Sequence, residues 1–179
     1  MKQRLFFILV VLIFMSCKTS FKVVENPTNY STVIKKGNLI GVIFSSNSTC
    51  FLCDSYKNRF TPTLEEIEKA ENIITEKIKE LNNPIINQGN DCPIIHKNLN
   101  HYRRQYFGYI DENGDKIIET LFSWNRFSIL DKIRGNSKTE IENWKQEKDI
   151  VFDGCSYYWE VSVNINKEFL FGLTINGIG

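Results

Sequence analysis

The alternation of hydrophobic and polar positions predicts one long helix near the middle of the chain. Hydrophobic residues recur at three- and four-residue steps from Leu64 to Leu81, which marks the buried face of an amphipathic helix. Thr63 and Glu66 have the spacing of a capping box at its start. The Asn-Asn-Pro segment 82–84 ends the pattern. We therefore expect a helix over residues 63–81.

The second half of the chain has the pattern of antiparallel hairpins. Segments 103–111 and 116–124 flank an Asn-Gly turn signal. Segments 157–165 and 169–175 alternate strictly, which predicts a second hairpin with one buried face. The apolar run 41–44 predicts a buried strand, and segment 139–146 predicts a short helix.

Together these elements predict the α+β class, with one long amphipathic helix packed on a curled antiparallel sheet built from hairpins. Small cystatin-like and PepSY-like domains resemble this arrangement in architecture. Residues 39–179 have the length of one domain and suffice to bury a core.

The first residues have the pattern of a bacterial lipoprotein signal peptide. Lys2 and Arg4 precede an uninterrupted apolar run from Leu5 to Met15, which is shorter than the roughly 20 residues that span a bilayer. The following Ser16-Cys17 pair resembles a lipobox. That resemblance implies removal of residues 1–16 and diacylation of Cys17, with a non-lipidated secretory signal as the alternative. The predicted location is the cell envelope, membrane-anchored and facing the periplasm or the surface.

Residues 17–38 are polar and without clear period, and we expect them to form a lipid-anchored tether. About 20 extended residues would reach roughly 65 Å from the membrane.

Composition narrows the function classes. Among 179 residues, 22 are Lys or Arg and 21 are Asp or Glu, so no basic surface for nucleic acid is predicted. Two His residues argue against a His-based metal centre or a Ser-His-Asp triad, and Gly-rich phosphate loops are absent from the sequence. We predict no cofactor.

Cys50 and Cys53 form the motif with most chemical promise. Their Cys-x-x-Cys spacing after a strand resembles that of thioredoxin-like oxidoreductases, and Pro93 lies where that family has a proline against the active site. The resemblance implies thiol-disulfide exchange by these two cysteines. The predicted helix, however, starts ten residues too late for this family, and the chain ends in a hairpin rather than a helix.

The cysteines beyond Cys17 also suggest disulfides, because an even number remains in an exported chain. Three pairings are possible; we favour Cys50–Cys53 and Cys92–Cys155, with free buried thiols as the alternative. A Cys₃His zinc site using His96 is a weaker hypothesis, because an oxidising envelope competes for the thiols.

Two polar segments have plainer explanations than ligand binding. Asp111, Asn113 and Asp115 have the spacing that opens a calcium loop, but Phe122 stands where the bidentate Glu should be, so we expect a hairpin turn. Segment 101–106 mixes basic and aromatic side chains and favours the start of a strand over an anion site. The aromatic run 157–159 favours sheet packing, with a binding surface as the alternative.

The order of these parts resembles that of uncharacterised small bacterial lipoproteins. The resemblance rests on segments 60–63, 104–110, 152–154 and 157–163 and on the closing Asn176-Gly177, and it implies no activity. We therefore expect a lipid-anchored, non-enzymatic module that binds a protein, a peptide or a glycan. The alternative is a membrane-tethered thiol oxidoreductase that uses Cys50 and Cys53.

Overall fold

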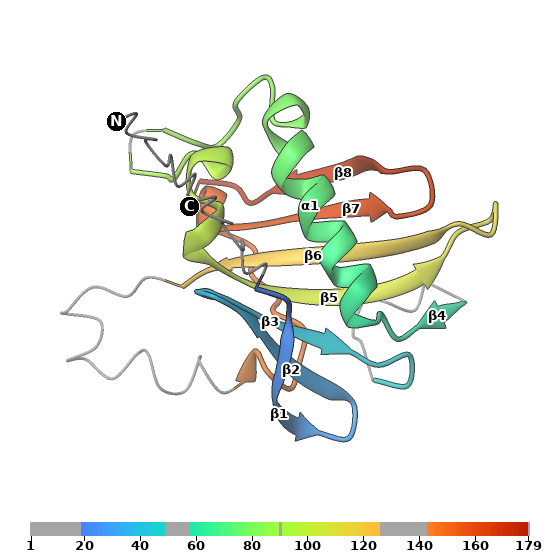
Figure 1. Ribbon diagram of the computed structural model, residues 1–179. Coiled ribbons are helices and arrows are strands. Elements are labelled where there is room, and N and C mark those ends of the chain that lie inside the picture. Colours follow the sequence, from blue (N-terminus) through green and yellow to red (C-terminus); the bar gives the residue numbers. More distant parts are fainter. Residues whose placement is uncertain (1–18, 49–57, 90, 126–142, 179) are drawn as a thin grey trace, which may run out of the picture.

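The computed structural model describes residues 19–48, 58–89, 91–125 and 143–178. In these residues it has the predicted α+β class, with a long α-helix lying across an open sheet of eight strands (Figure 1). The strands are β1 (Lys22–Thr28), β2 (Ser31–Lys36), β3 (Leu39–Phe44), β4 (Arg59–Phe60), β5 (Tyr102–Ile110), β6 (Lys116–Trp124), β7 (Tyr158–Asn164) and β8 (Phe169–Ile175). Their order is β1-β2-β3-β5-β6-β7-β8, and the short β4 also pairs with β5.

The predicted long helix is confirmed as α1 (Leu64–Leu81). Thr63 caps it through a hydrogen bond from the Glu66 amide to its hydroxyl, and the Glu66 carboxylate accepts one from the Thr63 amide. Its buried face includes Ile67, Ala70, Ile74 and Ile78, which pack with aliphatic and aromatic side chains of β5–β7 into the main core.

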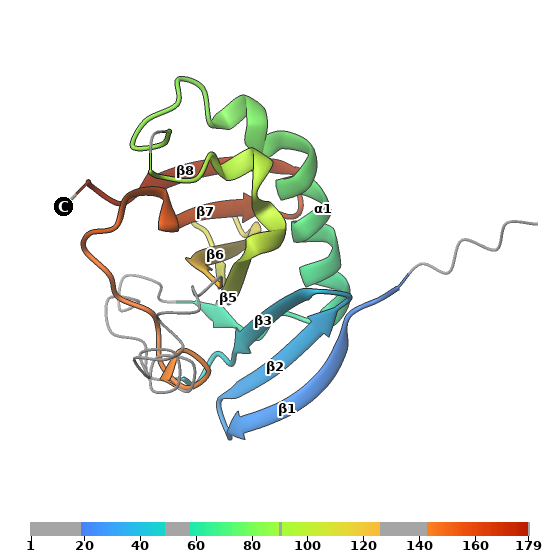
Figure 2. The same cartoon turned by 90° about the vertical axis from the view of Figure 1, so that its left-hand side faces the viewer.

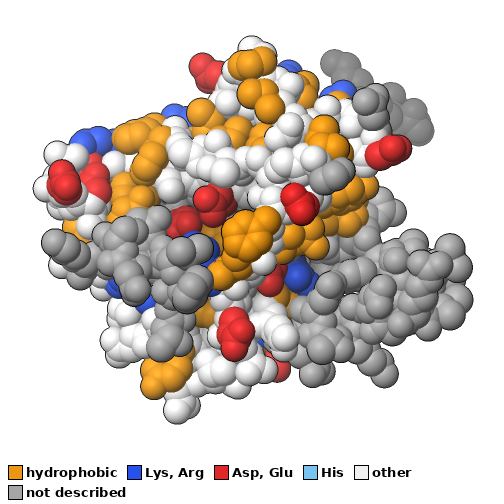
Figure 3. Space-filling view, turned by 180° about the vertical axis from the view of Figure 1, so that it is seen from behind, with side chains coloured by type: hydrophobic (Ala, Val, Ile, Leu, Met, Phe, Trp, Pro, Cys, Tyr) orange, Lys and Arg blue, Asp and Glu red, His pale blue; other side chains and the backbone are white. Residues whose placement is uncertain are grey.

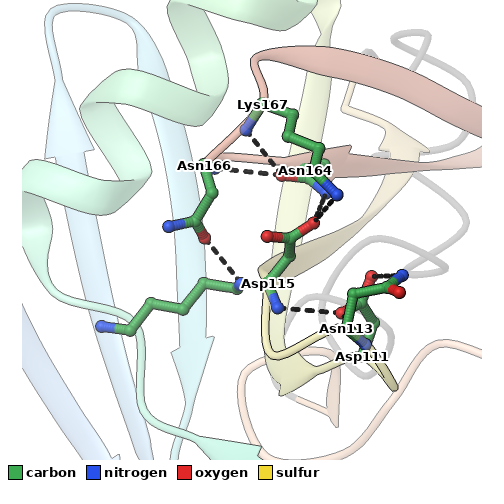
Figure 4. A network of polar contacts seen from close by, with 7 residues as sticks. Asp111, Asn113, Asp115, Asn164, Asn166 and Lys167 are labelled. Atoms are coloured by element: carbon green, nitrogen blue, oxygen red, sulfur yellow. Dashed lines mark hydrogen bonds and ion pairs between the residues drawn. The ribbon is translucent and has the colours of Figure 1, made fainter.

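Both predicted hairpins are present. Strands β5 and β6 pair in register along their whole length, and β7 pairs with β8 with one register shift. The turn between β5 and β6 is closed by Asp111, whose carboxylate accepts hydrogen bonds from the amides of Asn113 and Asp115. Asp115 in turn accepts from Asn164 and Lys167 at the β7–β8 turn (Figure 4). The two hairpin turns are therefore fixed to each other.

The sheet is mixed, so the expectation of an antiparallel sheet built from hairpins holds for part of it only. Strand β3 pairs in parallel with β5, and α1 lies in the connection between them. Parallel neighbours need such a crossover, and that pairing joins residues about 60 positions apart. The local sequence pattern carries no signal for it.

The tether expectation is also wrong over residues 22–36, which form β1 and β2. Phe21, Val33 and Ile34 are buried. Val33 and Ile34 point to opposite faces of the sheet, and each belongs to a different core cluster. A strand covered on both faces has no period-2 alternation, which explains why the pattern looked like a linker.

Three predictions lie wholly or partly outside the described residues. The predicted signal peptide and lipidated Cys17 fall within residues 1–18, and Cys50 and Cys53 within 49–57. Half of the helix expected at 139–146 falls within 126–142; in the other half Asn143 is helical, and its carbonyl accepts hydrogen bonds from the amides of Gln146 and Glu147.

Candidate functional site

The sheet face opposite α1 carries a row of polar side chains beside the smaller hydrophobic cluster around Phe107 and Leu121. This row consists of Arg103 and Gln105 from β5, Glu119 and Ser123 from β6, and Glu160 from β7. Figure 3 shows this side of the molecule, where acidic side chains lie among hydrophobic ones near the centre. Polar side chains gathered on a partly buried face are a common feature of binding sites, so this face is the candidate functional surface.

Residues 143–153, which we call the strap, cross this polar face. Figure 2 shows the strap and α1 on opposite sides of the sheet. Gln105 donates from its amide nitrogen to the carbonyls of Trp144 and Glu147, at 2.6 Å each, and its amide oxygen accepts from Asp149 N at 2.8 Å. At the other end, the Asn176 side-chain amide donates to the carbonyls of Val151 and Asp153. The strap is thus held by side chains that bind its backbone.

Two ion pairs add to this attachment. Asp149 accepts from Arg103 Nη2 at 3.1 Å and from Ser123 Oγ at 2.7 Å. Lys148 Nζ lies 3.1 Å from Glu119 Oε1. Both pairs are largely removed from water, so breaking either one would leave a poorly solvated charge.

A groove of about 310 Å³ lies between the strap and strands β6–β8. Glu119, Ser123, Tyr158, Glu160 and Thr174 line it from the sheet. The strap contributes an apolar wall formed by Ile150, Val151 and Phe152, of which Phe152 is 81% exposed. We call this cavity the strap groove. Its size is at the lower end of the range for small-molecule and peptide-side-chain pockets.

The sheet side of the strap groove holds two carboxylates close together. Glu119 pairs with Ser162 and Leu121 pairs with Glu160, so Glu119 and Glu160 are diagonal neighbours on one face. Burial raises the pKa of Glu160, the negative charge of Glu119 raises it further, and Lys148 partly offsets both effects. The carboxylates therefore repel each other in a partly desolvated site.

A second hollow, of about 560 Å³, lies between α1 and the β2–β3 turn. Its lining includes Lys36, Glu71 and His101. Lys36 is paired with Glu68, and Glu71 Oε1 accepts from Arg104 Nε and from the Tyr106 hydroxyl. The Lys36 and Glu71 charges are thus already compensated within the protein, which makes this hollow the weaker candidate.

Both arginines of segment 101–106 are buried within β5, on opposite faces of the sheet. Arg103 is 5% exposed and pairs with Asp149, while Arg104 is 2% exposed and pairs with Glu71. Neither guanidinium is available as a surface anion site. Strand alternation, which places neighbouring residues on opposite faces, already implied this separation.

The Cys92–Cys155 disulfide is confirmed, with a Cα–Cα distance of 6.2 Å. It removes Cys92 from the thiolates that a Cys₃His zinc site with His96 would need. Within the described ranges, no group of three or more His, Cys, Asp or Glu side chains could hold a metal ion.

The aromatic run 157–159 divides between the two faces. Trp159 stacks on Phe122 in the main core at 3.7 Å, whereas Tyr158 lines the strap groove. Strand alternation could have separated these roles in advance. The groove itself could not be predicted, because its apolar wall comes from a segment without strand or helix periodicity.

No family model matches the chain, and no solved structure matches it. In the part of the chain that the structure describes, no helix has both the length and the apolar character needed to span a bilayer.

Proposed function

We propose that this chain is a lipid-anchored protein of the bacterial cell envelope, and that it acts as a non-enzymatic binding module with the strap groove as its ligand surface. The observation that carries the proposal is the strap groove, which is lined both by an exposed aromatic side chain and by two largely buried carboxylates. Such a combination of apolar wall and few polar groups is typical of binding sites.

The positions of the potentially reactive side chains favour a binding role over a catalytic one. His96 and His101 are in the segment before β5, and neither lines the strap groove. The Ser123 hydroxyl donates to Asp149, whose carboxylate is paired with Arg103 and is therefore a poor base for activating it. The groove therefore offers recognition groups rather than a nucleophile with its base.

Because β1 and β2 belong to the folded domain, only a short piece of chain separates the domain from the proposed lipid anchor. Phe21 is buried and lies four residues after Cys17. Four extended residues reach about 14 Å, so a lipid on Cys17 would hold the β1–β3 part of the sheet near the membrane surface. Two acyl chains suffice for stable attachment.

Mass mapping of the membrane-extracted chain tests the anchor. We expect a mature N-terminal peptide that starts at Cys17 and carries diacylglycerol, and a Cys17→Ser variant that is not retained in the membrane. A mature N-terminus elsewhere, or an unmodified Cys17, would contradict the anchor without affecting the groove.

Photo-crosslinking in cells tests the binding role. A photoreactive residue at Phe152 should form discrete products, and the same residue at Val24, an exposed apolar position on β1, is the matched control. Equal yields from both positions, or products from neither, would contradict a binding surface at the strap groove.

A membrane-tethered thiol-disulfide oxidoreductase using Cys50 and Cys53 is the second proposal. It rests on the Cys-x-x-Cys spacing after β3. It is less favoured because α1 starts eleven residues after Cys53 and Cys92 is already bonded to Cys155. Alkylation of the free cysteines at controlled redox potential tests this second proposal. A Cys50–Cys53 bond that is reduced at about −270 to −120 mV would favour the oxidoreductase.

The likeness to cystatin-like or PepSY-like domains stays a proposal about architecture alone. It is supported by the way α1 packs on the antiparallel β5–β8 part of the sheet.

A further inference from the structure

We propose that the strap groove recognises a basic side chain, arginine in preference to lysine, carried by an extended peptide segment. This inference rests on the proposed function, because it names the ligand class of the same groove. Three features lead to it: an excess of carboxylates, a buried carboxylate oxygen without a hydrogen-bond partner, and an apolar wall along the strap.

The charges lining the strap groove do not cancel. It contains the carboxylates of Glu119, Asp149 and Glu160 and one ammonium group, that of Lys148. Asp149 is neutralised by Arg103, and Glu119 by Lys148. Among the described residues, no Lys, Arg or His side chain forms an ion pair with Glu160. The described residues that line the groove therefore leave one negative charge uncompensated.

The other nearby cation is already engaged. Arg59 feels the charge of Glu119, but its guanidinium donates to the Ser45 and Ser48 carbonyls and to the Ser48 hydroxyl. It is therefore held by those groups and does not pair with Glu160, which has no ion-pair partner in the described part of the chain.

Glu119 supplies the independent indication of a ligand. Its side chain is 5% exposed, and Oε1 contacts Lys148 whereas Oε2 is buried and has no hydrogen-bond partner. A buried carboxylate oxygen without a donor is costly, so a donor from a ligand would relieve a deficit already present in the fold.

The spacing of the two carboxylates favours a guanidinium group. Diagonal neighbours on adjacent strands lie about 7–8 Å apart, so an ion between Glu119 and Glu160 must donate in two directions. A guanidinium has five N–H donors in a planar fork, whereas an ammonium is a compact point charge. Tyr158 and Phe152 add aromatic surface, on which a guanidinium also stacks.

The strap favours a peptide as the carrier of that side chain. Ile150 and Val151 are each 39% exposed, and Phe152 extends the same apolar wall. A single small cation would use the carboxylates alone and leave this wall uncovered. A peptide would place its basic side chain on the sheet and its apolar neighbours against the strap.

Fluorescence polarisation of the full lipidated chain in detergent micelles tests the inference. The probes are two pools of capped, labelled hexapeptides with apolar flanks, which differ only in a central arginine or its neutral isostere citrulline. We expect the arginine pool to bind at least tenfold more tightly, with a preference that falls as salt is raised. A lysine pool should rank between them.

Substitutions then test which residues cause the preference for arginine over citrulline. Glu160→Gln should bring the arginine and citrulline pools within about twofold of each other, whereas Glu112→Gln, at the exposed β5–β6 turn, should leave the preference intact. Phe152→Ala should weaken both pools, and its exposure makes loss of folding an implausible cause. Circular dichroism of each variant checks that the fold is kept.

The outcomes separate the ligand class from the proposed function. Equal affinity for the arginine and citrulline pools, with both weakened by Phe152→Ala, would overturn the basic ligand but keep the groove. Free argininamide binding as tightly as the peptides would overturn the peptide carrier. Binding of a neutral oligosaccharide in place of every peptide would overturn the peptide class. Absence of any binding together with absence of crosslinks from position 152 would overturn the proposed function as well.

Discussion

At the residue scale, the polar groups under α1 are fixed in a buried network. Glu71 lies on α1 and accepts from Arg104 at 3.1 Å and from the Tyr106 hydroxyl at 2.9 Å. Arg104 also donates to the carbonyls of Tyr102 and Leu99. Burial raises the pKa of Tyr106 well above its usual value, and the charge of Glu71 adds to the effect, so the phenol remains a donor. The network ties the helix to the middle of the sheet.

Glu71→Ala should therefore be strongly destabilising. It leaves the Arg104 guanidinium buried without its counter-charge, which costs about 3–5 kcal/mol in comparable pairs. Urea unfolding of this variant is compared with that of Glu76→Ala, the same substitution at an exposed position of α1. A loss below about 1 kcal/mol for Glu71→Ala would show that the pair does not hold the helix.

Glu160 should make stability depend on pH. Because its folded pKa lies above the ordinary value of about 4.3, its favourable contribution is complete below that value and is lost as pH rises through the folded pKa. Glu160→Gln cannot ionise and should be more stable than the wild type at pH 7, by a few tenths of a kcal/mol after allowance for solvent screening.

The unfolding free energies of the wild type and of Glu160→Gln at pH 4 and pH 7 test the direction of this effect. The advantage of Glu160→Gln over the wild type should disappear at pH 4. An advantage that grows as pH falls would contradict the raised pKa. Binding sites commonly contain residues that lower the stability of the fold because they serve recognition.

At the element scale, the parts predicted from sequence are those with local signals. The capping box of α1 and the Asn-Gly turn between β5 and β6 act within a few residues, and both are present as expected. The parallel pairing of β3 with β5 depends on residues far apart in the chain, and β2 is buried on both faces. Neither leaves a periodic pattern, so the N-terminal hairpin looked like a tether.

Thr63→Ala should lower the unfolding free energy by about 1 kcal/mol, because it removes the hydroxyl that accepts from the Glu66 amide. Thr75→Ala is the matched control: it lies in the same helix, and its hydroxyl donates only to the Glu71 carbonyl within that helix. Thermal unfolding of both variants measures the difference. A larger loss from Thr75→Ala would contradict the capping role.

At the scale of the whole molecule, the Cys92–Cys155 disulfide joins the connection after α1 to the start of β7. Hydrogen bonds from Tyr157 to the Asp91 carbonyl and from Tyr102 to the Ser156 carbonyl reinforce the same junction. It lies next to the end of the strap, since Asp153 precedes Cys155 by two residues. The disulfide thus limits how far the strap can move from the sheet.

Replacing both cysteines by Ala should cost about 2–4 kcal/mol, because the bond spans a sequence separation of 63. Urea unfolding of the double variant should match that of the reduced wild type. Unchanged stability after reduction would contradict a structural role for this bond.

The candidate site was less predictable than the fold. Glu119 and Glu160 are separated by 41 positions and become neighbours only through the β6–β7 register. The apolar part of the strap, residues 150–152, has no secondary-structure pattern, and Gln105 holds the strap by binding its backbone groups. Such contacts depend on the assembled sheet, whereas the Cys92–Cys155 bond belongs to the favoured one of the three pairings that the even number of cysteines allows.

NMR chemical-shift mapping tests the central claim most directly. Isotope-labelled protein lacking residues 1–18, which keeps every described strand, is titrated with the arginine hexapeptide pool. We predict perturbed amides at Glu119, Ser123, Glu160 and Thr174, around the strap groove. Perturbations centred instead on Asn72, Thr75 and Asn100, at the hollow beside α1, would contradict the claim that the strap groove is the binding surface.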